Sequence, residues 1–256
     1  MLAPHAEAPE VPDSPDNPAA REWFDRTRWS RVIRAAGGTE TQSRQALEEL
    51  CRDYWYPLYT YARWRKESHE DACDHVQEFF LRLIEHRTLS VADPARGKFR
   101  TFLLSCFQHF LTSEVRRDKA VKRGGRITIV SIDEVDAEQR FRNEPVDHAT
   151  PEKHYDRAWA VTLLNRAYTA VRRRSEETGK VQLFDAIWPF LTGGAGRDDC
   201  YLEVGRRLGM TEGAVKTAAH RLRDRLRDAL REEIAQTVRG AGELDEEMRA
   251  FFAALV

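Results

Sequence analysis

Apolar residues recur every three or four positions along most of this chain, which is the spacing of one face of an amphipathic α-helix. Glycine pairs and prolines separate the periodic segments, as expected of helix ends and loops. The pattern predicts helices over residues 29–36, 43–65, 70–85, 99–117, 156–174, 181–191, 199–208, 211–238 and 243–256, with a bend or interruption at Pro57. Because no strand-rich region or internal repeat accompanies them, the chain is expected to be all-α.

Changes of composition along the chain predict two helical domains joined by a flexible linker. The first 22 residues are rich in Pro, Ala and acidic residues and poor in large apolar side chains, so we expect a disordered tail. A later segment holds Pro145, Pro151 and several acids but too few recurring apolar residues for a packed element. The predicted divisions are the tail at 1–22, a helical domain at 23–123, the linker at 124–152, a helical domain at 153–239 and an amphipathic helix at 240–256.

The stretch from Tyr201 to Leu230 has the pattern of a helix-turn-helix. Gly209 and Met210 suit the turn, and the hydroxyl of Thr211 suits the cap of the second helix. Gly205 would let the two helices approach closely, because it has no side chain. The alternative is an ordinary charged helix whose arginines face water.

Charge is segregated along the chain, although 41 Lys and Arg against 42 Asp and Glu leave a net charge of -1. Residues 96–126 are strongly basic, which suits nucleic-acid phosphates, whereas residues 67–85 are mainly acidic, which suits a basic protein surface. A coat of uniformly positive charge is excluded. The phenylalanines at 99, 102, 107 and 110 have the spacing of core residues.

Neither a metal nor a cofactor is expected. The four cysteines form no CxxC pair, which argues against a disulfide scaffold or a zinc ribbon. His69, Cys73 and His75 lie close in sequence, but a fourth ligand for zinc is not evident. No apolar run is long enough to cross a bilayer, and the first residues lack the order of a secretory signal, so we expect a cytoplasmic protein.

Three motifs together resemble the extracytoplasmic-function (ECF) class of bacterial sigma factors, within the sigma-70 family. YLEVGRRLGMTEGAVKTAAHRLRDRLRDAL, at 201–230, resembles sigma region 4. DACDHVQEFFLRL, at 71–83, resembles region 2, and GKFRTFLLSCFQHFLTSEVRR, at 97–117, resembles the aromatic and basic helix that melts the promoter. The motifs keep the family's order over residues 27–239, so the resemblance implies two all-α domains, regions 2 and 4, in one promoter-specificity subunit.

The resemblance also implies roles for particular residues. Region 2 would bind the clamp helices of the beta-prime subunit of core RNA polymerase through Asp74, Gln77 and Glu78. The loop at 89–98 and the helix after it would meet the minus-ten element, with phosphate-binding cations at Arg100, Arg116, Arg117 and Lys119. Region 4 would read the minus-thirty-five element through Thr211, Glu212, Lys216, Thr217, His220, Arg221, Arg223 and Arg225.

Within region 4 the side-chain chemistry suggests separate tasks. Glu212 suits the amino group of cytosine and Arg221 suits guanine, while Lys216 suits a phosphate, and Arg223 and Arg225 lie nearer the DNA backbone. The acidic residues of the linker, Glu134, Asp136, Glu138, Glu144 and Asp147, leave two readings open: a segment that resembles nucleic acid electrostatically, or a flexible tether.

Two other classes of protein explain less of the sequence than a sigma factor does. A stand-alone helix-turn-helix regulator leaves the acidic face at 71–83 unexplained. An all-helical hydrolase or metal enzyme lacks a nucleophile, a phosphate loop and paired carboxylates with a matching base, so we expect no enzyme. An anti-sigma protein or other regulator is a further candidate partner, and the apolar face of the C-terminal helix would bind it or dock onto this chain itself.

Overall fold

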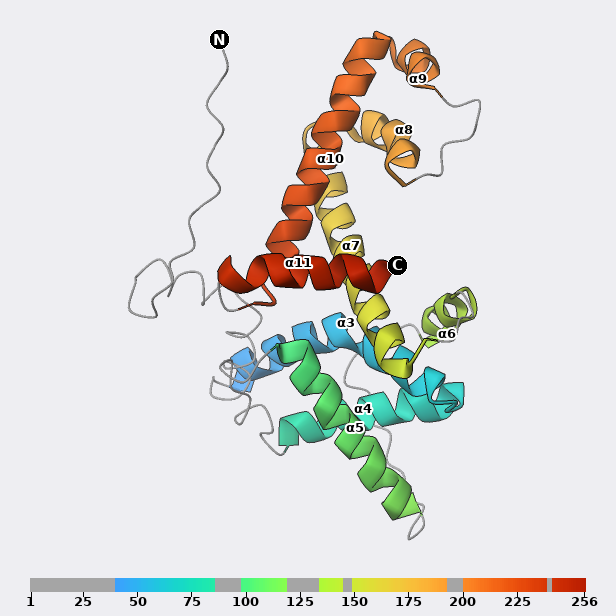
Figure 1. The fold of residues 1–256 in the computed structure, drawn as a ribbon, viewed down its shortest axis with the longest axis vertical. Helices are drawn as coiled ribbons and strands as arrows, with labels where there is room; N and C mark the ends of the chain where they lie inside the picture. The colour runs from blue at the N-terminus through green and yellow to red at the C-terminus, as the bar shows by residue number, and fades with distance from the viewer. Residues whose placement is uncertain (1–39, 86–97, 119–133, 145–148, 193–199, 239–240) are drawn as a thin grey trace, which may run out of the picture. The chain divides into compact units, whose positions relative to one another are not determined.

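The computed structural model describes residues 40–85, 98–118, 134–144, 149–192, 200–238 and 241–256 (Figure 1). Its helices are α3 (Glu40–Trp64), α4 (His69–Glu85), α5 (Phe99–Asp118), α6 (Glu134–Arg142), α7 (Pro151–Glu177), α8 (Val181–Thr192), α9 (Tyr201–Leu208), α10 (Glu212–Ala235) and α11 (Ala241–Leu255). Within these ranges there is no strand, and the predicted all-α fold is confirmed. The expected tail at 1–22 and the expected helix at 29–36 lie outside the described residues.

The chain divides into two compact units. The first contains residues up to Thr162 together with Ala235–Val256, and the second contains Leu163–Ile234. The first unit therefore holds α3 to α6, the beginning of α7, and α11, while the second holds the rest of α7 and α8 to α10. None of the described helices is long and apolar enough to cross a membrane.

The first unit is built around α3, which is buried on almost every side between Asp53 and Ala62. The helix continues through Pro57 without interruption, although proline removes one backbone hydrogen bond. The ring of Phe107 from α5 lies edge-on to Phe79 of α4, with centroids 5.1 Å apart, and edge-on to Tyr61 of α3 at 6.1 Å. These aromatic contacts join α3, α4 and α5 into one core.

The phenylalanines of α5 are mostly core residues, as their spacing predicts. Phe99, Phe107 and Phe110 are buried, and Phe102 is half-buried. Tyr54 of α3 lies edge-on to Phe99 with centroids 5.4 Å apart. The buried phenylalanines pack in the core and are therefore not accessible for stacking on bases.

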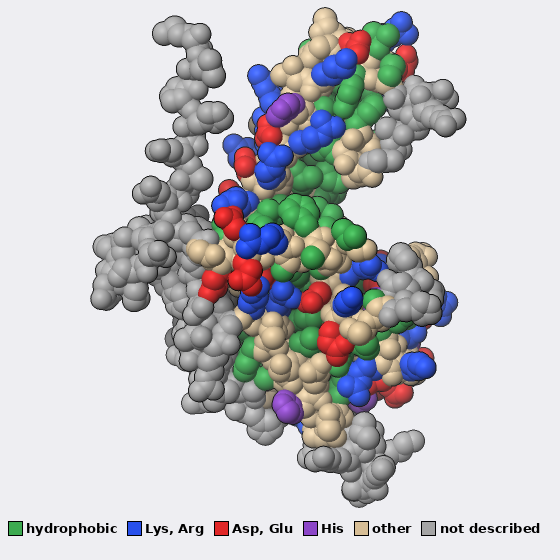
Figure 2. Space-filling view, in the orientation of Figure 1, with side chains coloured by type: hydrophobic (Ala, Val, Ile, Leu, Met, Phe, Trp, Pro, Cys, Tyr) green, Lys and Arg blue, Asp and Glu red, His purple; other side chains and the backbone are tan. Residues whose placement is uncertain are grey.

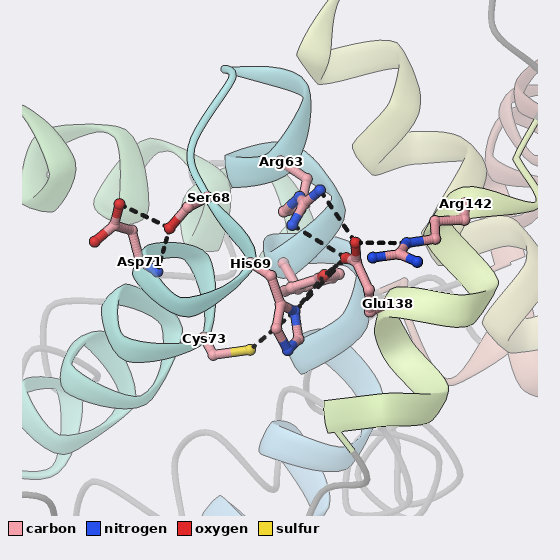
Figure 3. A network of polar contacts seen from close by, with 8 residues as sticks. Arg63, Ser68, His69, Asp71, Cys73, Glu138 and Arg142 are labelled. Atoms are coloured by element: carbon pink, nitrogen blue, oxygen red, sulfur yellow. Dashed lines mark hydrogen bonds and ion pairs between the residues drawn. The ribbon is translucent and has the colours of Figure 1, made fainter.

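Helix α6 lies inside the segment that the sequence predicts as a linker, and carboxylates attach it to α3. Glu138 accepts a hydrogen bond of 2.6 Å from the hydroxyl of Tyr59 and lies 3.0 Å from a guanidinium nitrogen of Arg63 (Figure 3). Glu144 accepts hydrogen bonds from the hydroxyl of Tyr56 at 2.7 Å and from the indole of Trp64 at 3.3 Å. Charge-assisted hydrogen bonds thus hold a segment that has few apolar residues.

The division of the structure differs from the boundaries expected from composition. The change from the first unit to the second falls inside α7, after Thr162, and not at the end of a linker at residue 152. The C-terminal segment from Ala235 belongs to the first unit. Glu138 of α6 and Glu247 of α11 make specific contacts with cations and a hydroxyl, whereas acid-rich sequence is on average solvated.

The contacts of Glu138 also set its protonation. Partial burial acts to raise the pKa of Glu138, but hydrogen bonds from Tyr59 and Arg142 and the charge of Arg63 outweigh it and hold the pKa below the ordinary value of 4.5. Since the folded pKa is the lower one, this carboxylate stabilises the fold above about pH 4.5, and the contribution is lost as the pH falls through the folded pKa.

We expect Glu138→Gln to lower the free energy of unfolding by about 1–2 kcal/mol at pH 7, because hydrogen bonds to a charged group in a partly exposed site are weakened. The difference from the unsubstituted protein should shrink as the pH falls toward 3. Urea unfolding followed by circular dichroism measures both effects. Gln139→Ala, an exposed position of the same helix, is the control. A difference that stays the same at pH 7 and pH 3 would contradict the charged contact.

Candidate nucleic-acid interface

The connection between α9 and α10 is a tight turn of the kind that the sequence predicts. Gly209 has a φ of 66°, in the left-handed region that glycine adopts without strain, and ends α9. The backbone N–H of Met210 donates to the carbonyl of Gly205 at 2.8 Å. Thr211 Oγ1 accepts from the N–H of Ala214 at 3.2 Å, which caps α10. The predicted glycine turn and the hydroxyl cap are both confirmed.

Close approach at the turn depends on Gly205. A Cβ atom built there would lie 2.6 Å from the carbonyl oxygen of Met210, so the space admits no side chain. Val204 of α9 and Val215 of α10 are buried in the same core, together with Phe184 of α8. This packing sets the direction in which α10 leaves the turn and therefore orients its exposed face.

The exposed face of α10 gathers the residues predicted to read the minus-thirty-five element. Figure 2 shows Lys, Arg and His side chains along this helix in the second unit. The predicted residues that are exposed are Thr211, Lys216, Thr217, His220, Arg221, Arg223 and Arg225, while Glu212 is half-buried. The opposite side of the helix is buried at Val215, Ala219, Leu222 and Leu230. Periodicity alone thus separated the two faces of this helix correctly.

Several of these polar side chains are already paired within the helix. Glu212 lies 2.6 Å from the ammonium of Lys216, and this hydrogen bond and charge raise the pKa of Lys216. His220 Nδ1 lies 2.9 Å from a carboxylate oxygen of Asp224. Arg221 and Arg225 have no ion pair among the described residues, so their guanidinium groups are the ones most available to an incoming anion.

The predicted polymerase-binding residues lie on α4. Asp74 is exposed, and Gln77 and Glu78 are half-buried. Glu78 pairs with Arg82 one turn later at 2.9 Å, and Arg82 also pairs with Glu114 of α5 at 2.7 Å. Part of the charge of Glu78 is therefore compensated within the protein, so Asp74 is the stronger negative point on this face.

The structure describes the side chain of only one of the four cations predicted to bind the minus-ten element. Lys119 and the side chains of Arg116 and Arg117 lie outside the described residues. Arg100, in the first turn of α5, is almost buried, with 12% of its side chain exposed. It forms an ion pair with Asp156 of α7 and a second one, 2.8 Å long, with Glu247 of α11. In this arrangement acidic side chains of the same chain hold Arg100.

Two residues of this contact are not among the predicted site residues, although Lys98 lies in the predicted basic segment. Lys98 and Glu247 lie 2.6 Å apart across nearly 150 residues of chain. Glu247 follows Asp245 and Glu246, a run that is typical of a solvated surface. Its burial was detectable only through the apolar face of the C-terminal helix, which docks within the first unit by burying Leu244 and Phe251.

The histidine and cysteine cluster makes ordinary hydrogen bonds. His69 Nδ1 lies 2.9 Å from the hydroxyl of Tyr59 and 3.8 Å from Cys73 Sγ, while His75 pairs with Glu67 at 2.8 Å. Among the described residues, no three His, Cys, Asp or Glu side chains come together as a group able to hold a metal ion. The polar atoms of this cluster attach α4 to its neighbours.

The fold of the described residues is all-helical, and in the second unit a tight, capped turn joins α9 to α10. The comparison with protein families then bears on the first unit: residues 39–121 match the family described as sigma-70 region 2. The matched segment includes α3, α4 and α5. No curated protein and no solved structure matches the chain.

Replacing Gly205 by Ala should destabilise the second unit by about 1–3 kcal/mol, because the new methyl group overlaps the carbonyl of Met210. Gly213→Ala is a matched control: nothing lies within 4 Å of a Cβ at this position of α10, so improved helix propensity should leave stability unchanged or raise it by up to about 1 kcal/mol. Thermal melts compare the two. Equal stability of the two variants would show that the close approach at Gly205 does not constrain the turn.

Proposed function

We propose that this chain is an ECF-class sigma factor, which binds core RNA polymerase and directs promoter recognition and transcription initiation. The single observation that carries the proposal is the region 2 match over residues 39–121. The capped helix-turn-helix in the second unit supports a region 4, which the family match does not cover. Sigma factors of this family are not enzymes, and in this role the protein acts in the cytoplasm.

Helix α4 provides the contact with the polymerase in this proposal. Its buried residues, Val76, Phe79 and Leu83, pack into the first unit, whereas Asp74 projects from the exposed side. An acidic face with the amide of Gln77 suits the basic surface expected of the clamp helices of the beta-prime subunit. The same face would repel DNA, which keeps the polymerase contact separate from the promoter contact.

Helix α10 provides the upstream promoter contact. A helix that follows a capped tight turn and exposes a polar face fits the major groove of duplex DNA. Arg221 is exposed and unpaired among the described residues, and a free guanidinium forms bidentate hydrogen bonds with guanine. Lys216 suits a phosphate, while Glu212, which it pairs with, suits the amino group of cytosine.

The downstream contact is assigned to α5 and its flanking segments. We place the cations for the minus-ten element at Arg100, Arg116, Arg117 and Lys119. Opening a duplex requires cations that hold the backbone of the separated strands. Since Arg100 is paired with Glu247 and Asp156, its contact with DNA requires an exchange of carboxylates for phosphates.

Asp74→Lys combined with Glu78→Lys should weaken binding to core polymerase lacking sigma by at least about tenfold, because like charges would face each other across the interface. Fluorescence anisotropy of the labelled protein with added core enzyme measures the change. Asp228→Lys combined with Glu232→Lys reverses two exposed charges on α10 and is the control for the change of net charge. Unchanged binding by the α4 variant would remove this helix face from the polymerase contact and count against the sigma factor assignment.

Arg221→Ala should reduce discrimination at one promoter position by about 1–3 kcal/mol, because a guanidinium pair with a base edge is lost. Lys216→Ala should instead weaken all sequences alike and reduce the slope of log affinity against log salt by about 1. Binding to a library of minus-thirty-five variants at several salt concentrations separates the two. If Arg221→Ala weakens every sequence equally, Arg221 is a phosphate contact and does not read bases.

A further inference from the structure

Two basic residues at the start of α5 are held by the C-terminal helix. Glu247 of α11 is completely buried; one of its carboxylate oxygens lies 2.6 Å from the ammonium of Lys98, and the other lies 2.8 Å from Nε of Arg100. Glu246, its neighbour, lies 3.0 Å from the same ammonium and stays largely exposed. One helix thus supplies both cations with acidic partners.

An aromatic contact accompanies these ion pairs. The guanidinium of Arg100 lies over the ring of Trp159 in α7, 4.4 Å from its centroid. Trp159 is buried and meets Phe251 of α11 edge-on, with centroids 6.3 Å apart. Apolar packing therefore positions α11 so that Glu247 faces the two cations.

Both cations remain charged in this environment. Burial acts to lower the pKa of Lys98, but hydrogen bonds and charge from Glu247 and Glu246 outweigh it and raise the pKa. The pKa of Arg100 is raised in the same way, since Glu247 and Asp156 outweigh the effect of burial. Charged Lys98 and Arg100 are the groups that phosphates of a nucleic acid would otherwise attract.

We propose that α11 is an intramolecular cover of the nucleic-acid-binding cations at the start of α5, with Glu246 and Glu247 occupying the places of two strand phosphates. A single nucleic-acid strand then contacts Lys98 and Arg100 only after α11 has moved away from them. The identity of that strand, the opened minus-ten element, rests on the proposed function. The covering contact itself rests on the geometry of residues within the first unit.

Physical reasons favour a displaceable cover over a permanent brace. The ion pair of Glu246 is solvent-exposed, and exposed pairs contribute little and are screened by salt. Lys98 keeps 22% of its side chain exposed, so a strand reaches it from solvent before the buried pair opens. A phosphate backbone also carries many charges, so it competes with the two carboxylates more strongly than a single anion does.

The first test removes the two charges while keeping the side-chain shapes. The variant E246Q/E247Q should bind a labelled single-stranded oligonucleotide of mixed sequence at least threefold more tightly than the unsubstituted chain. Two freed phosphate contacts should steepen the salt dependence of log affinity by about 1.4, at about 0.7 for each contact. E70Q/E232Q removes two exposed carboxylates elsewhere and is the charge-matched control. Equal affinity of E246Q/E247Q and this control would overturn the cover.

A second comparison ties any gain to the two cations. In a background that carries K98Q and R100Q, adding E246Q/E247Q should give no further gain in affinity, because nothing remains to be uncovered. A gain of the same size in that background would mean that the glutamates act by general repulsion, which overturns the proposal.

Amide hydrogen exchange of the unsubstituted chain decides the matter even if E246Q/E247Q folds poorly. Saturating oligonucleotide should speed amide exchange in α11, because the helix separates from the start of α5. Unchanged or slower exchange would show that α11 stays packed there permanently and is not a displaceable cover. If the oligonucleotide speeds exchange in α11 but the chain supports no initiation with core polymerase, α11 is a cover and the chain is not a sigma factor. If the chain supports initiation while α11 stays protected from exchange in the open complex, the cover is overturned and the sigma assignment stands.

Discussion

A buried or half-buried charge must meet an opposite charge or a hydrogen bond, and this constraint assembles the first unit of the protein. Glu247 is completely buried, and it is tolerated there because Lys98 and Arg100 reach both of its oxygens. Glu138 is tolerated beside the aromatic residues of α3 because Tyr59 and Arg63 meet it. Through these two carboxylates, α11 and α6 join a core that α3, α4 and α5 form by aromatic packing.

In the second unit the charged residues of α10 lie at the surface and do not hold the core together. Its ionic residues on α10 are exposed, and the positioning comes from Gly205, Gly209 and the buried valines of the turn. An exposed arginine such as Arg221 keeps its hydrogen-bonding capacity for a ligand, whereas the largely buried Arg100 already forms ion pairs with Asp156 and Glu247. In the proposed function, exposure and not residue type therefore distinguishes the cations that bind DNA directly from those that must first leave their carboxylates.

Local features of the fold were predictable from sequence because they depend on neighbours in the chain. Periodic apolar residues located the described helices other than α6, and Gly209 and Thr211 marked the turn and cap between α9 and α10. The contacts of α6 and α11 were not predictable, because Tyr59 meets Glu138 and Lys98 meets Glu247 across long stretches that carry no periodic signal. Arg100 remains a predicted DNA contact, and the structure adds the acids that compete for it.

If the chain converts core RNA polymerase into a promoter-specific enzyme, one transcription assay will reveal this activity. Core enzyme lacking sigma is incubated with fragments of the source genome, with and without the purified chain, and the transcripts are mapped by their 5′ ends. A sigma factor should give discrete start sites that depend on the chain and share sequence elements upstream. Transcripts that are the same with and without the chain, while the chain still binds duplex DNA on its own, would contradict it and identify a stand-alone helix-turn-helix regulator.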